Sequence, residues 1–190
     1  YVKITTDFLD RQNINYEHDN MKYWRIAGRQ KYSPFDYTVP ADFSSATFFL
    51  CAAAFLDADI TITGLDFNDS QPDKAVVEYL RKMDADITVS KDRVRVKGSK
   101  LRGAEIDMNR TPDALPAMAV TAAFAKGPSK LYNVAQARKK ETDRIDCMAK
   151  ELTKMSAKVE QLQDGLIIEP ANKFNPCEFE GYHDHRIVMA

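Results

Sequence analysis

The chain has 190 residues, of which 44% are hydrophobic and 29% are charged, the balance of an ordinary globular protein. Its 27 basic and 28 acidic residues leave a net charge of −1, which argues against the basic excess typical of a nucleic-acid-binding domain. No stretch approaches the roughly 18 to 20 apolar residues of a membrane span. We therefore expect neither nucleic acid nor a membrane as a partner.

The first 28 residues predict a short helix around Phe8 and Leu9, then a hairpin of strands at 15–17 and 23–27. A polar stretch bounded by Pro34 and Pro40 follows and predicts a linker, with a domain boundary near residues 36 to 41. The chain opens without an initiator Met and stops inside an apolar run, so we expect both ends to be cuts.

A repeat of 71 residues organises the rest of the chain, because Asp42, Asp113 and Asp184 each introduce a small or apolar run. Asp is a favourable N-cap, since its carboxylate accepts free amides of the first helical turn. The runs after Asp42 and Asp113 are apolar all round, which predicts core helices buried on every side. The run after Asp184 begins a third copy.

Each core helix is followed by the same predicted elements: a strand, an amphipathic helix and two alternating strands. These are the strands at 60–65, 85–90 and 93–98 in one copy and at 130–134, 157–162 and 166–170 in the next. The repeating unit is strand-helix-strand-helix-strand-strand. The predicted fold class is α/β (α+β), with buried parallel helices inside and four-stranded sheets outside.

Three polar segments, 107–113, 138–144 and 183–186, lie at loop-to-helix junctions of this scaffold. Helix N-termini offer free amides and a positive dipole end, which suit anions. Lys140 and Arg144 are four residues apart and are expected on one face of a helix's first turn. Basic residues there usually form a solvated surface, but they oppose the helix dipole. Four basic residues within seven (138–144) therefore indicate a bound anion.

Metal binding is not expected. The spacing of His183 and His185 would suit two ligands, but no third ligand supports them, because Cys177 is expected in a loop and His18 belongs to another repeat. Cys51, Cys147 and Cys177 are odd in number and widely spaced, and fit neither a disulfide framework nor a metal knuckle. Reduced thiols in a cytoplasmic protein are the expectation.

Four segments carry a resemblance to a known family: Asp-Phe-Ser-Ser-Ala at 42–46, Pro-Asp-Ala at 112–114, Lys-Glu-Thr-Asp-Arg at 140–144 and Asp-His-Arg-Ile-Val-Met-Ala at 184–190. In order and spacing they resemble the signature segments of 5-enolpyruvylshikimate-3-phosphate synthases. The resemblance implies two lobes of three repeats each, with the active site between them. Residues 1–39 would then be the last part of the N-terminal lobe plus the linker. Residues 40–190 would be the C-terminal lobe, truncated in its last repeat.

The implied reaction joins phosphoenolpyruvate to the 5-hydroxyl of shikimate 3-phosphate and releases phosphate, without a metal or organic cofactor. The resemblance makes Asp113 the acid/base nearest the shikimate hydroxyl, and Glu141 and Lys140 the candidates for proton delivery to phosphoenolpyruvate. Arg144 and Arg186 would clamp its carboxylate and phosphate, because guanidinium forks make bidentate pairs. Asp113 and Lys140 would also help to bind the substrates.

Two departures from the family pattern affect the substrate side. Gln136, a candidate contact for the shikimate phosphate, stands where the family usually has Asn, and Lys139 replaces a usual apolar residue. Without the N-terminal lobe as its partner, the fragment is expected to be inactive. Two alternatives stay open: an enzyme like UDP-N-acetylglucosamine enolpyruvyl transferase, whose cysteine-bearing loop is not evident here, and a non-catalytic repeat module that binds a phosphorylated ligand or RNA.

Overall fold

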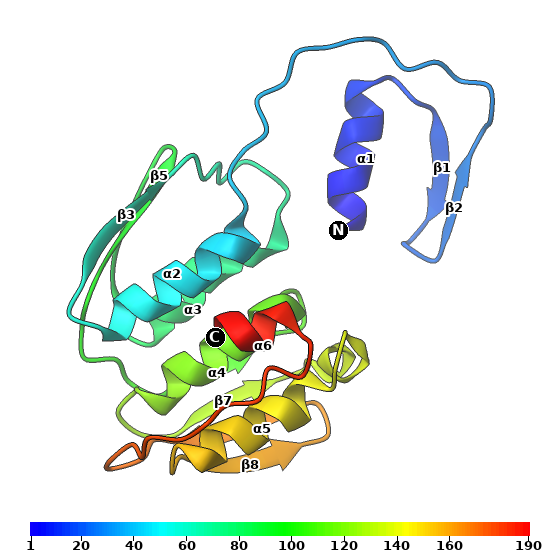
Figure 1. The fold of residues 1–190 in the computed structure, drawn as a ribbon. Helices are drawn as coiled ribbons and strands as arrows, with labels where there is room; N and C mark the ends of the chain where they lie inside the picture. Colours follow the sequence, from blue (N-terminus) through cyan, green and yellow to red (C-terminus); the bar gives the residue numbers. More distant parts are fainter.

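The computed structural model describes residues 1–190 as a small N-terminal segment and a larger layered unit (Figure 1). The α-helices are α1 (Val2–Arg11), α2 (Phe43–Phe55), α3 (Val76–Lys82), α4 (Leu115–Ala123), α5 (Arg144–Lys154) and α6 (His185–Met189). The strands are β1 (Tyr16–Asp19), β2 (Tyr23–Ile26), β3 (Asp59–Thr63), β4 (Asp86–Ser90), β5 (Arg93–Lys97), β6 (Glu105–Asp107), β7 (Ser129–Tyr132), β8 (Lys158–Leu162) and β9 (Gly165–Glu169). Short 3-10 helices are η1 (Pro72–Ala75), η2 (Pro112–Ala114) and η3 (Ala135–Lys139).

The N-terminal segment contains the expected helix and hairpin, α1 followed by the antiparallel pair β1 and β2. On the hairpin the rings of His18 and Trp24 stack with centroids 4.7 Å apart. Residues 27–42 then run without helix or strand to the start of α2, and this stretch forms the long connection in Figure 1.

The first repeat has a three-stranded sheet of order β3-β5-β4, with both pairs antiparallel. The expectation of a four-stranded sheet is wrong here, because no strand precedes α2. Pro34 and Pro40 have no N–H to donate to a ladder, and most of the stretch around them is exposed.

The second repeat has the expected four strands, in the order β6-β7-β9-β8. β6 lies parallel to β7, which is antiparallel to β9, and β9 pairs with β8. The order β7-β9-β8 repeats β3-β5-β4 of the first copy, so the sequence repeat is also a structural repeat.

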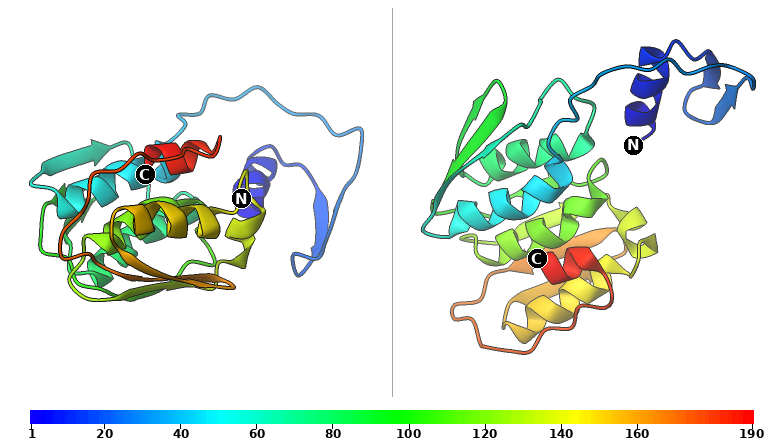
Figure 2. Two further views of the ribbon diagram at one scale, coloured as in Figure 1. Left: turned by 60° about the horizontal axis from the view of Figure 1, so that its bottom comes forward. Right: turned by 45° about the horizontal axis from the view of Figure 1, so that its top comes forward.

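The helices α2 and α4 pack side by side and run in the same direction, with the two sheets on the outside (Figures 1 and 2). A single core cluster of 38 buried residues extends through both repeats. Apolar side chains that recur along each helix and strand face this cluster, and burying each large one stabilises the fold by about 1.5 to 3 kcal/mol.

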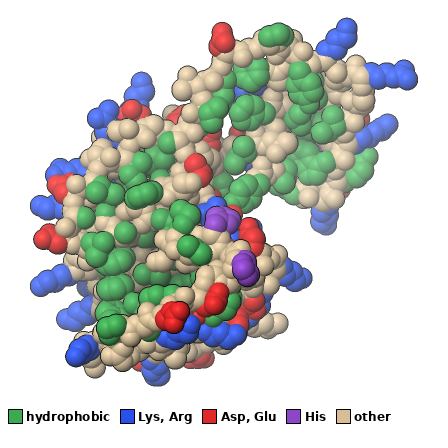
Figure 3. Space-filling model, in the orientation of Figure 1, with side chains coloured by type: hydrophobic (Ala, Val, Ile, Leu, Met, Phe, Trp, Pro, Cys, Tyr) green, Lys and Arg blue, Asp and Glu red, His purple; other side chains and the backbone are tan.

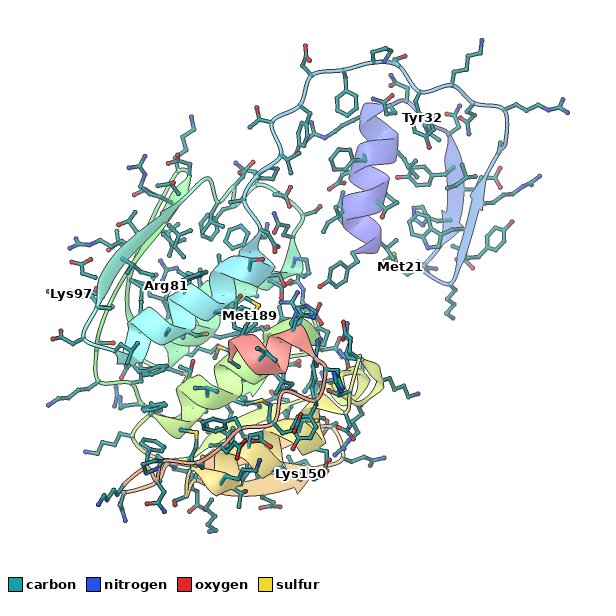
Figure 4. The ribbon with its side chains drawn as sticks, in the orientation of Figure 1. Met21, Tyr32, Arg81, Lys97, Lys150 and Met189 are labelled. Atoms are coloured by element: carbon teal, nitrogen blue, oxygen red, sulfur yellow. The ribbon has the colours of Figure 1, made fainter.

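The prediction that the core helices are buried on every side is wrong for one face. Phe49 in the middle of α2 is 63% exposed and Val188 in α6 is 70% exposed. The short helix α6 contacts α4 and α5, and Met189 lies at the end of α6 on this face of the layered unit (Figure 4). Hydrophobic side chains therefore form a strip on the surface of this face (Figure 3). None of the helices has the length and apolarity needed to span a bilayer.

Candidate active site

The three polar junctions converge at one end of the core helices. Asp113 lies in η2, just before α4. Lys140 lies between η3 and α5, and Arg144 is the first residue of α5. Arg186 lies in the first turn of α6. The elements that carry them are in contact, η2 with η3 and α4 with both α5 and α6. The expectation that these segments stand at loop-to-helix junctions is confirmed.

Asp113 is the common partner of the basic residues. Its Oδ1 accepts from Arg144 Nη1 at 2.7 Å and lies 3.1 Å from Lys140 Nζ, while Arg186 Nη2 is 4.0 Å from Oδ2. Tyr1 donates its hydroxyl to Oδ2 at 2.6 Å. Burial opposes ionisation of Asp113, but the hydrogen bonds from Tyr1 and Lys140 and the charges of Lys140 and Arg186 outweigh it and lower its pKa to about 2. The carboxylate is an acceptor at neutral pH.

The three repeat aspartates differ in their contacts. Asp42 accepts from the amides of Ser44 and Ser45, both at 3.0 Å, and Asp184 accepts from the amide of Arg186 at 2.8 Å, so both cap their helices as predicted. Asp113 makes no such bond, and its interpretation as an N-cap is wrong. The 3-10 turn at Pro112 starts the helix instead, which leaves this carboxylate for the cations.

Arg144 is buried, with 1% of its side chain exposed, and three carboxylates surround it. Nε and Nη2 donate to Asp184 at 2.7 and 3.1 Å, Nη1 donates to Asp113, and Nη2 also donates to Glu141 at 2.7 Å. Burial disfavours the guanidinium charge, but these carboxylates raise its pKa overall. Glu141 has 49% of its side chain exposed, which makes it the most easily displaced of the three.

Arg186 is also largely buried, at 15% exposure, yet its guanidinium has few acceptors. Its contacts are the carbonyl of Ser44 at 3.5 Å, Asp113 at 4.0 Å and the ring of Phe48 at 5.9 Å. Long contacts of this kind leave donors available, so Arg186 is the cation of the site best prepared to accept an added anion.

One expectation about the basic run is wrong, and one of its four basic residues pairs outside the cluster around Asp113. Lys140 does not share a helical face with Arg144, because it follows the end of η3 in an extended conformation and α5 starts only at Arg144. Arg138 points away from Asp113 and donates to Asp143 and to the carbonyls of Leu162 and Gln163. Arg138 thus anchors η3 to the turn between β8 and β9.

An open cleft of about 750 Å³ extends from this cluster between α1 and the layered unit. Lys140 and Gln136 line it, and Gln136 donates to the carbonyl of Asn109 at 2.7 Å. Tyr1 and Lys3 line the opposite wall. Sequence reasoning missed Tyr1, because 112 residues separate it from Asp113 and no motif surrounds it.

Comparisons with known proteins agree with this geometry. The EPSP synthase (3-phosphoshikimate 1-carboxyvinyltransferase) family profile matches residues 1–190. A 3-phosphoshikimate 1-carboxyvinyltransferase of Ruminiclostridium cellulolyticum is 52% identical over 190 residues, and one of Methanococcus aeolicus is 43% identical over 195 residues. Each alignment covers all of this chain and 45% of the relative.

Among solved structures, an EPSP synthase from Acinetobacter baumannii superposes with a TM-score of 0.83 at 31% identity, over 97% of this chain and 46% of that one. The enolpyruvyl transferase NikO from Streptomyces tendae matches with a TM-score of 0.66 at 22% identity, over 88% of this chain and 39% of that one. The fold is therefore that of the enolpyruvyl transferases.

Within that class, the chain belongs to the EPSP synthase family. It spans about 45% of the length of the curated relatives it matches.

Proposed function

We propose that this chain is the C-terminal portion of a cytoplasmic 3-phosphoshikimate 1-carboxyvinyltransferase, which transfers an enolpyruvyl group from phosphoenolpyruvate to shikimate 3-phosphate. Residues 1–39 would close the N-terminal lobe and residues 40–190 would form most of the C-terminal lobe. The observation that carries the proposal is the convergence on Asp113 of Lys140, Arg144 and Arg186, which come from separate junctions. The proposed reaction involves no metal, nucleic acid or membrane.

Arg186 supports the binding of phosphoenolpyruvate in this proposal. It has spare donors, whereas those of Arg144 are largely occupied by carboxylates. Arg144 could take the anion only by releasing a partner, and the exposed Glu141 is the one that can leave at least cost. An incoming carboxylate or phosphate would thus replace Glu141 on Nη2 of Arg144. The Lys140 ammonium could then give up a proton, which the released Glu141 carboxylate would take and pass to the enol carbon.

Asp113 would accept the proton of the 5-hydroxyl. A carboxylate with a pKa of about 2 is a weak base, and a general base works best when its pKa lies near the working pH. Two anionic substrates in the cleft would oppose the cations that lower this pKa and would raise it toward the useful range. On the wall of the cleft that carries Asp113, Gln136 and Lys140 would contact the phosphate of shikimate 3-phosphate.

Phosphate release from the two substrates tests the proposal. The chain alone should be inactive, because an open cleft does not exclude water from the reacting groups. Adding the N-terminal half of the Ruminiclostridium cellulolyticum relative should give turnover. Asp113→Asn should lower kcat by about 10²- to 10⁴-fold, as expected for a positioned acid/base group.

Asp57→Asn is the control, since it removes the same charge from an exposed residue outside the cleft. Absence of turnover with the added half, or an Asp113→Asn variant whose kcat equals that of Asp57→Asn, would contradict the assignment.

A further inference from the structure

Asp73, in η1, is a buried carboxyl to which the catalytic proposal gives no role. Only 3% of the residue is exposed. Gln71, two residues before Asp73, holds η1 against the start of α2 by accepting from the amide of Phe43 at 2.8 Å and donating to the carbonyl of Ala41 at 3.0 Å. This clamp fixes Asp73 beside the N-terminus of α2.

The Oδ1 atom of Asp73 is buried without a hydrogen-bond partner. The other deeply buried carboxylates are well paired: Asp184 accepts from Arg144 and Thr142, and Glu151 accepts from Lys154, Tyr182 and the amide of Glu180. An unpaired buried charge is costly, so such a group either holds a proton or awaits a donor. Asp73 therefore differs in kind from the structural carboxylates.

Asp73 lies beside the candidate active site, because its chain neighbours Pro72 and Lys74 line the cleft together with Lys140. Asp73 interacts electrostatically with ionisable groups of each neighbouring element. These are Tyr1 before α1, Asp42 at the cap of α2, Tyr79 of α3, Asp113 of η2, Lys140 before α5 and Arg186 of α6. Burial and the charge of Asp113 raise the pKa of Asp73 to about 6, although Arg186 and Lys140 oppose them. The Asp73 carboxyl therefore loses its proton as the pH rises through about 6.

We propose that Asp73 is a positioning residue of the anion site, whose buried carboxyl keeps its proton while an anion occupies Arg186 and so adds no negative charge beside that anion. The inference rests on the proposed function only in taking that anion to be a substrate phosphate or carboxylate. When Asp73 ionises instead, its negative charge repels the anion.

The sign of the pH effect follows from linkage. A bound anion favours the neutral form of Asp73, so a proton on Asp73 equally favours the anion. Anion affinity should be highest below the pKa of Asp73 and should fall as pH rises through it. A structural role alone would not link this carboxyl to anion binding.

Sulfate is the probe, because it remains a dianion across the range and contributes no titration of its own. We expect the sulfate affinity of the 190-residue chain, measured by calorimetry, to fall about tenfold more between pH 5.0 and 7.5 than that of Asp73→Asn, the size expected for one nearby like charge. Asp57→Asn should behave as the wild type. Equal pH dependence in wild type and Asp73→Asn overturns the proposal.

A second measurement needs no variant. Carboxyl carbon-13 NMR of the wild-type chain should show the pKa of Asp73 rising by about one unit when sulfate is added, which corresponds to a tenfold linkage. An unchanged pKa, or no sulfate binding at any pH, overturns the proposal. Neither measurement requires turnover. Failure of phosphate release alongside a normal Asp73 response would contradict the transferase assignment alone.

Discussion

Arg144 forms ion pairs with three carboxylates, and its environment combines a large desolvation cost with several charge-assisted hydrogen bonds. Its side chain is 1% exposed and that of Asp184 is fully buried. Replacing such a pair by apolar residues can be neutral, but removing one partner leaves an uncompensated buried charge. The Arg144–Asp184 pair is therefore sensitive to single substitutions, whatever its net contribution to stability.

Asp184→Ala should lower the free energy of unfolding by about 3 to 5 kcal/mol, because it removes the fully buried partner of the Arg144 guanidinium and also the cap of α6. Urea denaturation followed by circular dichroism measures the change. Glu169→Ala is the matched control, since its ion pair with Lys158 lies on the surface and should cost at most about 1 kcal/mol. Equal losses in the two variants would mean that Arg144 finds other partners.

For single residues, the sequence predicts which ones belong to the candidate site better than it predicts their contacts. Asp113, Lys140, Arg144 and Arg186 come from motifs, and helix junctions explain why they meet. Their pairing could not be predicted, because the choice between a bound anion and a carboxylate partner depends on distances of a few ångströms. Asp73 offers no motif signal: an Asp after Pro at a helix start is ordinary, and only the packing of η1 shows that its oxygen is unpaired.

At the scale of elements, close approach of backbones sets the geometry of the second sheet. Gly165 starts β9, where a Cβ would lie 2.0 Å from the carbonyl oxygen of Leu131 in β7. Gly165 thus lets β7 and the β8–β9 turn approach each other. Arg138 donates hydrogen bonds to carbonyls of this turn, so the position of the turn helps to fix η3 and the segment after it that carries Lys140.

Gly165→Ala should destabilise the chain by about 2 to 3 kcal/mol, since the clash is with main chain that cannot rotate away. Gly28→Ala is a stringent control because nothing lies within 4 Å of its added Cβ. Both changes restrict the unfolded chain equally, so their difference in denaturation midpoint isolates the clash. A Gly165→Ala variant as stable as Gly28→Ala would show that β7 and β9 can separate without cost.

The elements themselves could largely be predicted from the sequence. Alternation indicates β4, β5, β8 and β9 to within about a residue or two, and helical spacing indicates the amphipathic helices α3 and α5. Pro34 and Pro40 argue against a strand before α2. The repeat argued for one, because the second copy has a strand at the equivalent position. The break between η3 and α5 was not predictable, because Lys140 lies within one continuous polar run whose turn depends on Arg138 reaching the β8–β9 loop.

At the scale of the whole molecule, the N-terminal segment and the layered unit are joined by a long exposed connection and share the cleft (Figure 2). All 38 residues of the core cluster lie from Phe43 onward, so α1 and the hairpin contribute nothing to it. The contact between Tyr1 and Asp113 is one of the few polar links across the cleft. Stability and site assembly are thus separate in this chain: the layered unit supplies the core, and the N-terminal segment supplies a wall of the cleft.

Limited trypsin digestion should therefore cut first at Arg29 or Lys31, which are exposed and lie outside every helix and strand. The product that begins near Tyr32 should resist further digestion and should unfold at the same urea concentration as the intact chain, because it retains the entire core cluster. Mass spectrometry and circular dichroism measure the two quantities.

Replacing both sites, Arg29→Gln with Lys31→Gln, should slow this first cut without changing the later ones. The same product separates two roles of the N-terminal segment. If that segment only completes the cleft, its removal leaves the unfolding midpoint unchanged and weakens sulfate binding, since Asp113 loses the hydrogen bond from Tyr1 and opposes the anion more strongly. A large fall in the midpoint would instead show that α1 and the hairpin stabilise the layered unit through the cleft, even though none of their side chains enters its core.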